Sequence, residues 1–377
     1  MLRLLAAVAP ADSVRSYRLL VTAESDDQVA LVEFIPCRAQ SRPGCGARVV
    51  RTYAVGVHPV DIEGPHGVIA ALDGKSFFVT IAHGKPNGWL LQYDLASGDL
   101  LGQVGLGMFP ATVDLDPAGQ LLYAINFNFN DPEMKPSSLS VVHAGTMTEI
   151  ARIPTCRMPH GSRLDPKGRR HYSGCMMDDL LVEVDAARRE VSRLFSLAPG
   201  KEGPVPLPTV AAGGSRAPMG TTSHGEHTAR TPSNVCSPTW AQPSADGQRV
   251  YVACNRSNEI VEIDVASWTM TRRWKTPAAP YNLAATPDGK LLLATQKGPG
   301  TITIWRLTDA TLVADIPGTR KIASGIVVSP DSRYAFATLE GIGDDPGTVD
   351  VIDLEQHTKV ATITVGRQAG GVAVLPQ

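Results

Sequence analysis

Short apolar runs alternate with polar turns along almost the whole chain, and no stretch keeps a helical period of apolar residues. The runs recur in one repeated strand–turn–strand pattern. A small or aromatic residue opens an apolar strand, a turn such as Asp73-Gly74 or Asp288-Gly289 follows, and a second apolar strand returns. Gly and Asp tolerate the positive φ of tight hairpin turns. The pattern therefore predicts an all-β chain built from hairpins.

This sequence repeat occurs in six full copies, and a seventh copy stops after its first strand. Aligning the copies gives the equivalent positions 66, 111, 160, 240, 281, 324 and 370, which lie about 41 to 49 residues apart except for one spacing of 80. Each hairpin is followed by a third strand, which in several copies ends in Asp, as at Asp94 and Asp185, and by a fourth strand. Four strands at this spacing are typical of a propeller blade. We therefore expect a seven-bladed β-propeller.

The two ends of the chain complete the count of blades. Residues 17–55 supply three strands, and residues 372–375 supply a lone strand that lacks partners of its own. Pairing both ends in one blade leaves no open sheet edge. The expected organisation is a signal-like or disordered lead-in over 1–16 and a single propeller over 17–377. The long spacing adds an insertion at about 199–235.

The second-strand sequence Tyr251-Val252-Ala253-Cys254-Asn255 is similar to the repeat motif of the YVTN-type propellers of secreted bacterial proteins. The resemblance extends over nearly the whole chain. It implies the propeller fold and says almost nothing about function, because propellers host binding, hydrolase, lyase and redox roles alike.

Six cysteines fall into three local pairs: Cys37 with Cys45, Cys156 with Cys175, and Cys236 with Cys254. In the last two pairs a hairpin turn lies near the midpoint, so antiparallel pairing brings the cysteines face to face. The alternative is a metal site made from four of them, but the Cys-x₂-Cys spacing of such sites is missing. Three disulfides predict an oxidising compartment, and we expect a periplasmic or secreted protein.

Charge and hydropathy restrict the partners. The net charge is −2 without a basic block, so nucleic acid is not expected to bind. No apolar run is long enough for a membrane span. The N-terminal residues combine one arginine, a short apolar stretch and Ala9-Pro10-Ala11, which resembles the end of an export signal. We expect a monomer that binds a small molecule or peptide.

Histidines gather at one face of the predicted propeller. The inner strand of each blade begins at this face. His66 and His160 occupy the same repeat position, His83 ends a second strand, and His224 and His227 lie in the insertion. Imidazole and thioether ligands suit copper, with iron or zinc next. The sequence thus predicts a metal site with these five histidines as candidate ligands. Copper is the favoured metal, and the expected chemistry is that of an oxidoreductase.

Several other functions stay open at this stage. Either rim histidine alone can serve as a strand cap, and the insertion histidines can be solvated loop residues. Trp240, Tyr281 and Met177 are candidate ligand-binding residues at the same face. The alternatives to a metalloprotein are a non-enzymatic propeller that binds a ligand or protein, and a propeller hydrolase or lyase with a rim histidine as base.

Overall fold

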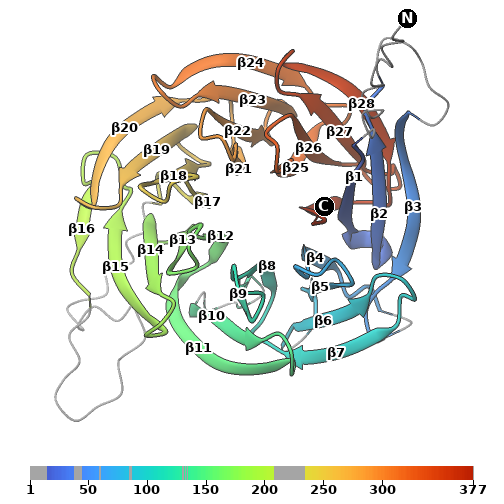
Figure 1. Cartoon of the computed structure of the whole chain (residues 1–377). Coiled ribbons are helices and arrows are strands. Elements are labelled where there is room, and N and C mark those ends of the chain that lie inside the picture. Colours follow the sequence, from blue (N-terminus) through green and yellow to red (C-terminus); the bar gives the residue numbers. More distant parts are fainter. Residues whose placement is uncertain are drawn as a thin grey trace, which may run out of the picture.

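Short β-strands form a ring of small sheets around a central axis in the computed structural model (Figure 1). The structure describes residues 15–37, 45–58, 61–84, 87–129, 131, 133, 135–207 and 234–376. Over these residues the only helical element is a single 3₁₀ turn, η1 (Glu24–Asp26). The expectation of an all-β, propeller-like fold made of small four-stranded sheets is confirmed.

Five of the sheets in the described chain have four strands each, with neighbouring strands antiparallel. The first contains β29 (Ala369–Val374), β1 (Tyr17–Ala23), β2 (Gln28–Ile35) and β3 (Gly46–Ala54). The second contains β4 (Pro65–Ala70), β5 (Ser76–Ile81), β6 (Trp89–Asp94) and β7 (Leu100–Gly105). The third contains β8 (Pro110–Leu115), β9 (Leu121–Asn126), β10 (Pro136–His143) and β11 (Thr148–Arg157). The other two contain β21 (Pro280–Ala285), β22 (Leu291–Gln296), β23 (Thr301–Arg306) and β24 (Thr311–Pro317), and β25 (Ile322–Val328), β26 (Tyr334–Glu340), β27 (Thr348–Asp353) and β28 (Thr358–Thr364).

The sixth sheet has nine strands, in the order β16-β15-β14-β13-β12-β17-β18-β19-β20. One half contains β12 (Pro159–Leu164), β13 (Arg170–Cys175), β14 (Leu180–Asp185), β15 (Glu190–Ser196) and β16 (Gly203–Val205). The other half contains β17 (Pro238–Pro243), β18 (Arg249–Cys254), β19 (Glu259–Asp264) and β20 (Thr269–Lys275). The halves meet through the parallel pair Gly161 and Trp240.

The ends of the chain share one sheet, as predicted. β29 pairs antiparallel with β1, with Val372 opposite Val21 and Val374 opposite Leu19. β29 takes the innermost place in this sheet, so β1 is paired on both sides and is not an open edge. The ring is therefore held together at its join by backbone hydrogen bonds.

Turn chemistry explains where the third strands end. Asp94 and Asp185 each stand at the last position of a strand, and each carboxylate accepts backbone N–H bonds from residues two and three positions further along. An Asp that caps a turn in this way stops the strand and starts the return. Apolar side chains from facing sheets then fill the space between them, as in the cluster that joins Leu20, Phe77 and Tyr93.

The three predicted disulfides are all present: Cys37–Cys45, Cys156–Cys175 and Cys236–Cys254. Cys156 belongs to β11 and Cys175 ends β13, so this bridge connects two neighbouring sheets. The bridges are compatible with a protein that works outside the cytoplasm. Within the described residues, no helix has the length and apolar character needed to cross a membrane.

The insertion contains an element that the sequence pattern did not predict. Residues 203–205 form β16, which pairs antiparallel with β15 at the outer edge of its sheet. Glu202 beside it forms an ion pair with Arg273, 3.0 Å apart. This part of the insertion therefore lies at the rim of the ring, far from the axis (Figure 1). Residues 208–233, and the lead-in up to residue 14, lie outside the described residues.

Candidate site in the central cavity

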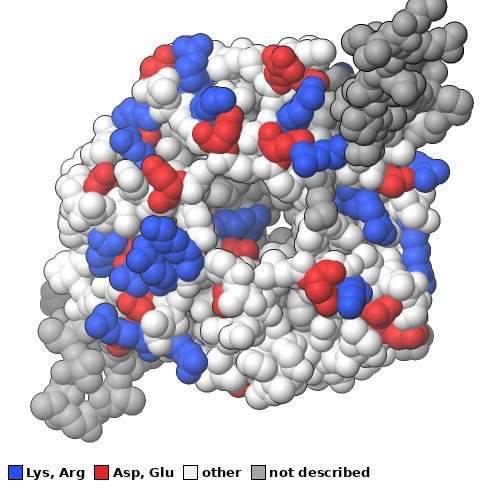
Figure 2. Space-filling view, in the orientation of Figure 1, with Lys and Arg blue, Asp and Glu red and all other residues white. Residues whose placement is uncertain are grey.

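The inner strands surround a cavity at the axis of the ring. Its lining comes from β4, β8, β12, β17, β21, β25 and β29 among the described strands. Figure 2 shows the corresponding hollow at the centre of one face, with charged side chains inside it. About 480 Å³ of space is free of protein atoms, of which about 50 Å³ is open to the centre of a water molecule. The cavity is thus small and narrow.

A closed ring of side-chain hydrogen bonds runs around this cavity within the described chain. Each inner strand offers a backbone carbonyl near its start, and a side chain of the preceding unit donates to it. The donor–acceptor pairs are Thr22 to His66, His66 to Ala111, Thr112 to His160, His160 to Thr239, Thr239 to Tyr281, Thr295 to Ser324 and Thr338 to Gly370. The ring ties neighbouring inner strands together through buried polar groups.

His66 and His160 take part in this ring where other units use threonine. The Nδ1 atom of His66 lies 2.7 Å from the Ala111 carbonyl oxygen, and Nδ1 of His160 lies 3.0 Å from the Thr239 carbonyl oxygen. A carbonyl oxygen only accepts, so Nδ1 must carry the proton in both rings. In a neutral ring with the proton on Nδ1, Nε2 carries the lone pair.

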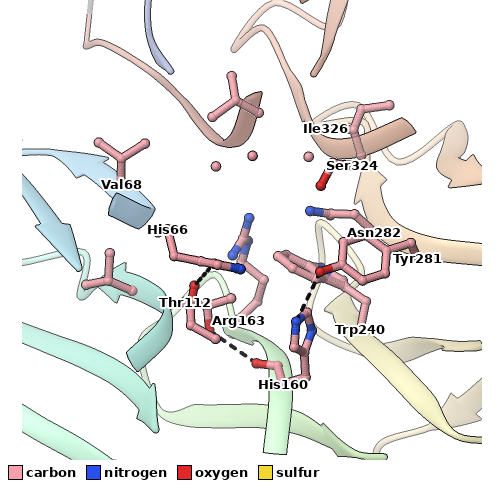
Figure 3. Close-up of a pocket in the computed structure, with 17 residues that line it drawn as sticks. His66, Val68, Thr112, His160, Arg163, Trp240, Tyr281, Asn282, Ser324 and Ile326 are labelled. Carbon is pink, nitrogen blue, oxygen red and sulfur yellow. Dashed lines mark hydrogen bonds between the residues drawn. The ribbon is translucent and has the colours of Figure 1, made fainter. Parts of the chain in front are cut away.

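His160 is buried and its second nitrogen is also bonded. Its Nε2 accepts a hydrogen bond from the Tyr281 hydroxyl at 3.1 Å (Figure 3). Lys297 Nζ lies 3.9 Å from the centre of the Tyr281 ring and donates to Glu340. Burial, and then the neighbouring His66, lower the pKa of His160 to about 3. His160 is therefore a neutral hydrogen-bonding group at physiological pH.

The structure brings His66 and His160 together, with ring centres 6.2 Å apart. Phe109 and Phe127 pack against these two rings, at 5.5 Å from His66 and 4.8 Å from His160 respectively. Both histidines line the cavity, together with Tyr281. The repeat alignment that placed the two histidines at equivalent positions thus agrees with the geometry.

His83 lies apart from this pair. Its Nε2 is 2.7 Å from Oε1 of Glu24. This hydrogen bond raises the pKa of His83 above its usual value, although burial acts in the opposite direction. Phe109 packs beside His83 at 5.7 Å between ring centres. His83 does not line the central cavity, so the three described candidate ligands do not converge on one point. Glu24, its partner, lies in the 3₁₀ turn and was missed because the contact joins distant parts of the sequence.

Trp240 lies one residue further along its strand than the repeat alignment predicted. Pro238 pairs with Cys254 as Pro159 pairs with Cys175, so Thr239 is the true equivalent of His160. Trp240 nevertheless lines the cavity, and its buried Nε1 has no hydrogen-bond partner among the described residues.

Met177, His224 and His227 are not part of the described cavity. Met177 packs against the apolar cluster around the Cys156–Cys175 bridge, and its sulfur lies 3.5 Å from Nδ2 of Asn234. His224 and His227 fall within 208–233, outside the described residues. In the part of the chain that the structure describes, no group of three or more His, Cys, Asp or Glu side chains is placed to hold a metal ion.

Two cavity residues were missed by sequence reasoning. Arg163 in β12 and Asn282 in β21 both line the cavity and stand out in Figure 3. The available signal was a charged or amide side chain within a predicted inner strand. A polar residue at such a position is expensive to bury unless it is partnered.

Comparison with known proteins supports the fold. No family model matches the chain, and no curated protein matches it. A protein of unknown function from Desulfotomaculum acetoxidans DSM 771 is similar in structure, with a TM-score of 0.66 and 14% identity over 96% of this chain and 99% of that one. Hydrazine synthase of Kuenenia stuttgartiensis is similar with a TM-score of 0.63 and 19% identity, over 86% and 93% of the two chains. At these identities the likeness concerns the fold alone.

Proposed function

We propose that this chain is an extracytoplasmic seven-bladed propeller that binds a small molecule in its central cavity. The count of seven treats the nine-stranded sheet as two blades joined by the Gly161–Trp240 pair, with β16 as an added edge strand. The hydrogen-bond ring supports this count, because it passes once through each of the described inner strands. The disulfides support a periplasmic or secreted location.

The observation that carries the binding proposal is a pair of polar side chains at the cavity wall. Arg163 lines the cavity, and its one hydrogen bond within the described residues runs from Nη1 to the Ser162 carbonyl oxygen. Asn282 also lines the cavity, and Figure 3 shows its amide nitrogen directed into it. Ligand sites combine apolar walls with a few such convergent polar groups. A bound small molecule would accept hydrogen bonds from both side chains.

A cavity-blocking variant tests the proposal. Ser324 lines the cavity, so Ser324→Phe would place a ring inside it. We expect at least one compound of a library of small acids, amines and sugars to raise the melting temperature of the wild type and to lose this effect with Ser324→Phe. Ser97→Phe, on an exposed turn, serves as the control. A library in which every shift survives in the blocked variant would refute cavity binding.

Metal binding is the second candidate, and a specific observation favours it. The Nδ1 contacts of His66 and His160 leave Nε2 as the coordinating atom of each ring, an arrangement common among metal-binding histidines. Imidazole donors suit copper or zinc. The fit is partial, because His83 is bonded to Glu24 and the Nε2 of His160 already accepts from Tyr281.

Copper loading distinguishes the two candidates. If His66 and His160 hold a metal, the purified chain retains about one equivalent of copper after dialysis, and His66→Ala with His160→Ala removes it. Retention below about one tenth of an equivalent would contradict a tight site. The metal would supply redox chemistry when bound. A hydrolase or lyase that uses His160 as base is less favoured, since a pKa of about 3 makes it a weak base.

A further inference from the structure

Arg163 determines the charge of the cavity. Among the described residues, the cavity lining contains this guanidinium and no carboxylate. The acid that interacts with it most is Asp114, whose oxygens accept backbone N–H bonds from Leu164 at 2.6 Å and Leu115 at 3.2 Å. No carboxylate of the described chain lies within ion-pair distance of Arg163. The cavity therefore presents a positive group without a direct anionic partner.

The guanidinium is held in place with most of its donors unused. Its Nη1 donates to the Ser162 carbonyl oxygen at 3.0 Å, and its central carbon lies 4.6 Å from the centre of a Trp240 ring. Stacking of this kind fixes the plane of the group. A guanidinium has five N–H donors in a fork that matches two carboxylate oxygens. The remaining donors are available to a ligand.

The cavity wall also offers a group for a second, polar part of the ligand. Figure 3 shows the amide nitrogen of Asn282 directed into the cavity. A hydroxyl oxygen of a ligand can accept a hydrogen bond from this amide.

The size of the cavity limits the ligand to a few atoms. A water molecule needs roughly 10–15 Å³ of space for its centre. The 50 Å³ available here corresponds to a handful of such positions. A molecule of the size of acetate or glycolate matches this space, whereas a sugar or a peptide side chain with its backbone does not.

We propose that the ligand of the central cavity is a small organic carboxylate, bound through its carboxylate group by Arg163 and through a hydroxyl by the Asn282 amide. This assignment rests on the proposed binding function and gives it a substrate class. Binding of an anion also offsets the cost of keeping the Arg163 charge in a buried place.

Titration calorimetry of the full chain with glycolate, acetate, nitrate and the neutral analogue glycolamide tests the assignment at constant ionic strength. We expect glycolate to bind at one site, and glycolamide to bind at least about tenfold more weakly, because a charge-assisted contact is lost. Arg163→Lys should weaken glycolate binding by a similar factor, since lysine keeps the charge and lacks the fork. Arg333→Lys is the matched control, as that guanidinium lies 5.8 Å from the centre of the Tyr334 ring and does not line the cavity.

Each outcome decides the assignment. Equal binding of glycolate and glycolamide to the wild type would overturn it, and this comparison needs no variant to fold. Binding of nitrate without either carboxylate would reassign the site to inorganic oxyanions. If a neutral compound binds and Ser324→Phe blocks it, the binding function stands and the carboxylate assignment fails. If no compound binds the wild type, both fail.

Discussion

At the residue scale, the histidines differ in role according to the hydrogen bonds that their ring nitrogens make. His66 and His160 each donate a hydrogen bond from Nδ1 to a carbonyl oxygen of the next inner strand. Elsewhere in the ring, threonine hydroxyls donate the equivalent bonds, as at Thr22, Thr112 and Thr295. The sequence shows that the two histidines occupy equivalent positions. It cannot show the carbonyl oxygens that hold them, because these belong to the next blade. Part of their role is therefore structural.

His171 offers a test of buried-histidine energetics at a position that does not line the cavity. It is fully buried against Tyr123, and neither ring nitrogen has a partner among the described residues. Burial lowers its pKa to about 3 from the ordinary 6.5. Between these values the unfolded chain binds a proton that the folded chain does not. Folding stability contributed by the neutral ring is therefore present above pH 6.5 and is lost as the pH falls towards 3.

We predict that His171→Phe flattens this dependence. The free energy of unfolding of the wild type should fall by up to about 1.4 kcal/mol more per pH unit than that of the variant between pH 6 and 4. At pH 7 the variant should be as stable as the wild type or more so, since no hydrogen bond is lost. Urea unfolding at several pH values measures both effects. His143→Phe, a partly exposed position, is the control, and parallel pH profiles for wild type and His171→Phe would contradict the account.

At the scale of strands, the alternating pattern predicted most of the elements and the turn residues that end them. It placed the rim residue of β17 one position too far along, at Trp240, although Pro238 is the equivalent of Pro159 and Thr239 that of His160. The one-residue bulge after the opening proline is common to β4, β8, β12, β17 and β21, so it does not cause this difference. A shift of one residue changes which side chain reaches the rim. β16 was missed for another reason, since three residues are too few to show a period.

The disulfides provide a prediction at this scale. Cys156 lies four residues before His160, and its bridge to Cys175 connects the end of β11 to β13. Replacing both cysteines by serine should cost about 2–4 kcal/mol of stability and loosen the strand that carries His160 and Arg163. We expect cavity binding to weaken more than in the matched variant Cys236→Ser with Cys254→Ser. Calorimetric melting and ligand titration of both variants, under non-reducing conditions, provide the comparison. Equal losses of stability with unchanged binding would make both bridges purely structural.

At the scale of the whole molecule, the fold depends on closure between the two ends of the chain. The sequence predicted this closure because a lone C-terminal strand had no partner nearby. β29 buries Ala369 and Val372 and pairs with β1 along its length. Its Gly371 backbone lies close to His66, so closure also shapes the wall of the cavity. The site is thus a property of the assembled ring, and its polar lining could not be predicted from any single repeat.

Removal of residues 369–377 should therefore open the ring. We expect the shortened chain to melt at least about 10 °C lower and to self-associate, because β1 becomes an unpaired edge. A synthetic peptide of residues 366–377 should restore the melting temperature by adding the missing strand in trans. Size-exclusion chromatography and thermal melting, with and without the peptide, measure this. A shortened chain that stays monomeric and equally stable would show that closure is dispensable.

The claim that the central cavity binds a small molecule is tested most directly by the indole N–H resonance of Trp240 in ¹⁵N-tryptophan-labelled protein. The chain has five tryptophans, and Trp240→Phe identifies the signal. On titration with glycolate, the Trp240 resonance should shift and saturate, because the Trp240 ring lines the cavity and stacks on Arg163, while the other four stay within experimental error. A Trp240 resonance that remains unmoved by glycolate and by every compound of the library, or that moves only together with all the others, would contradict the account.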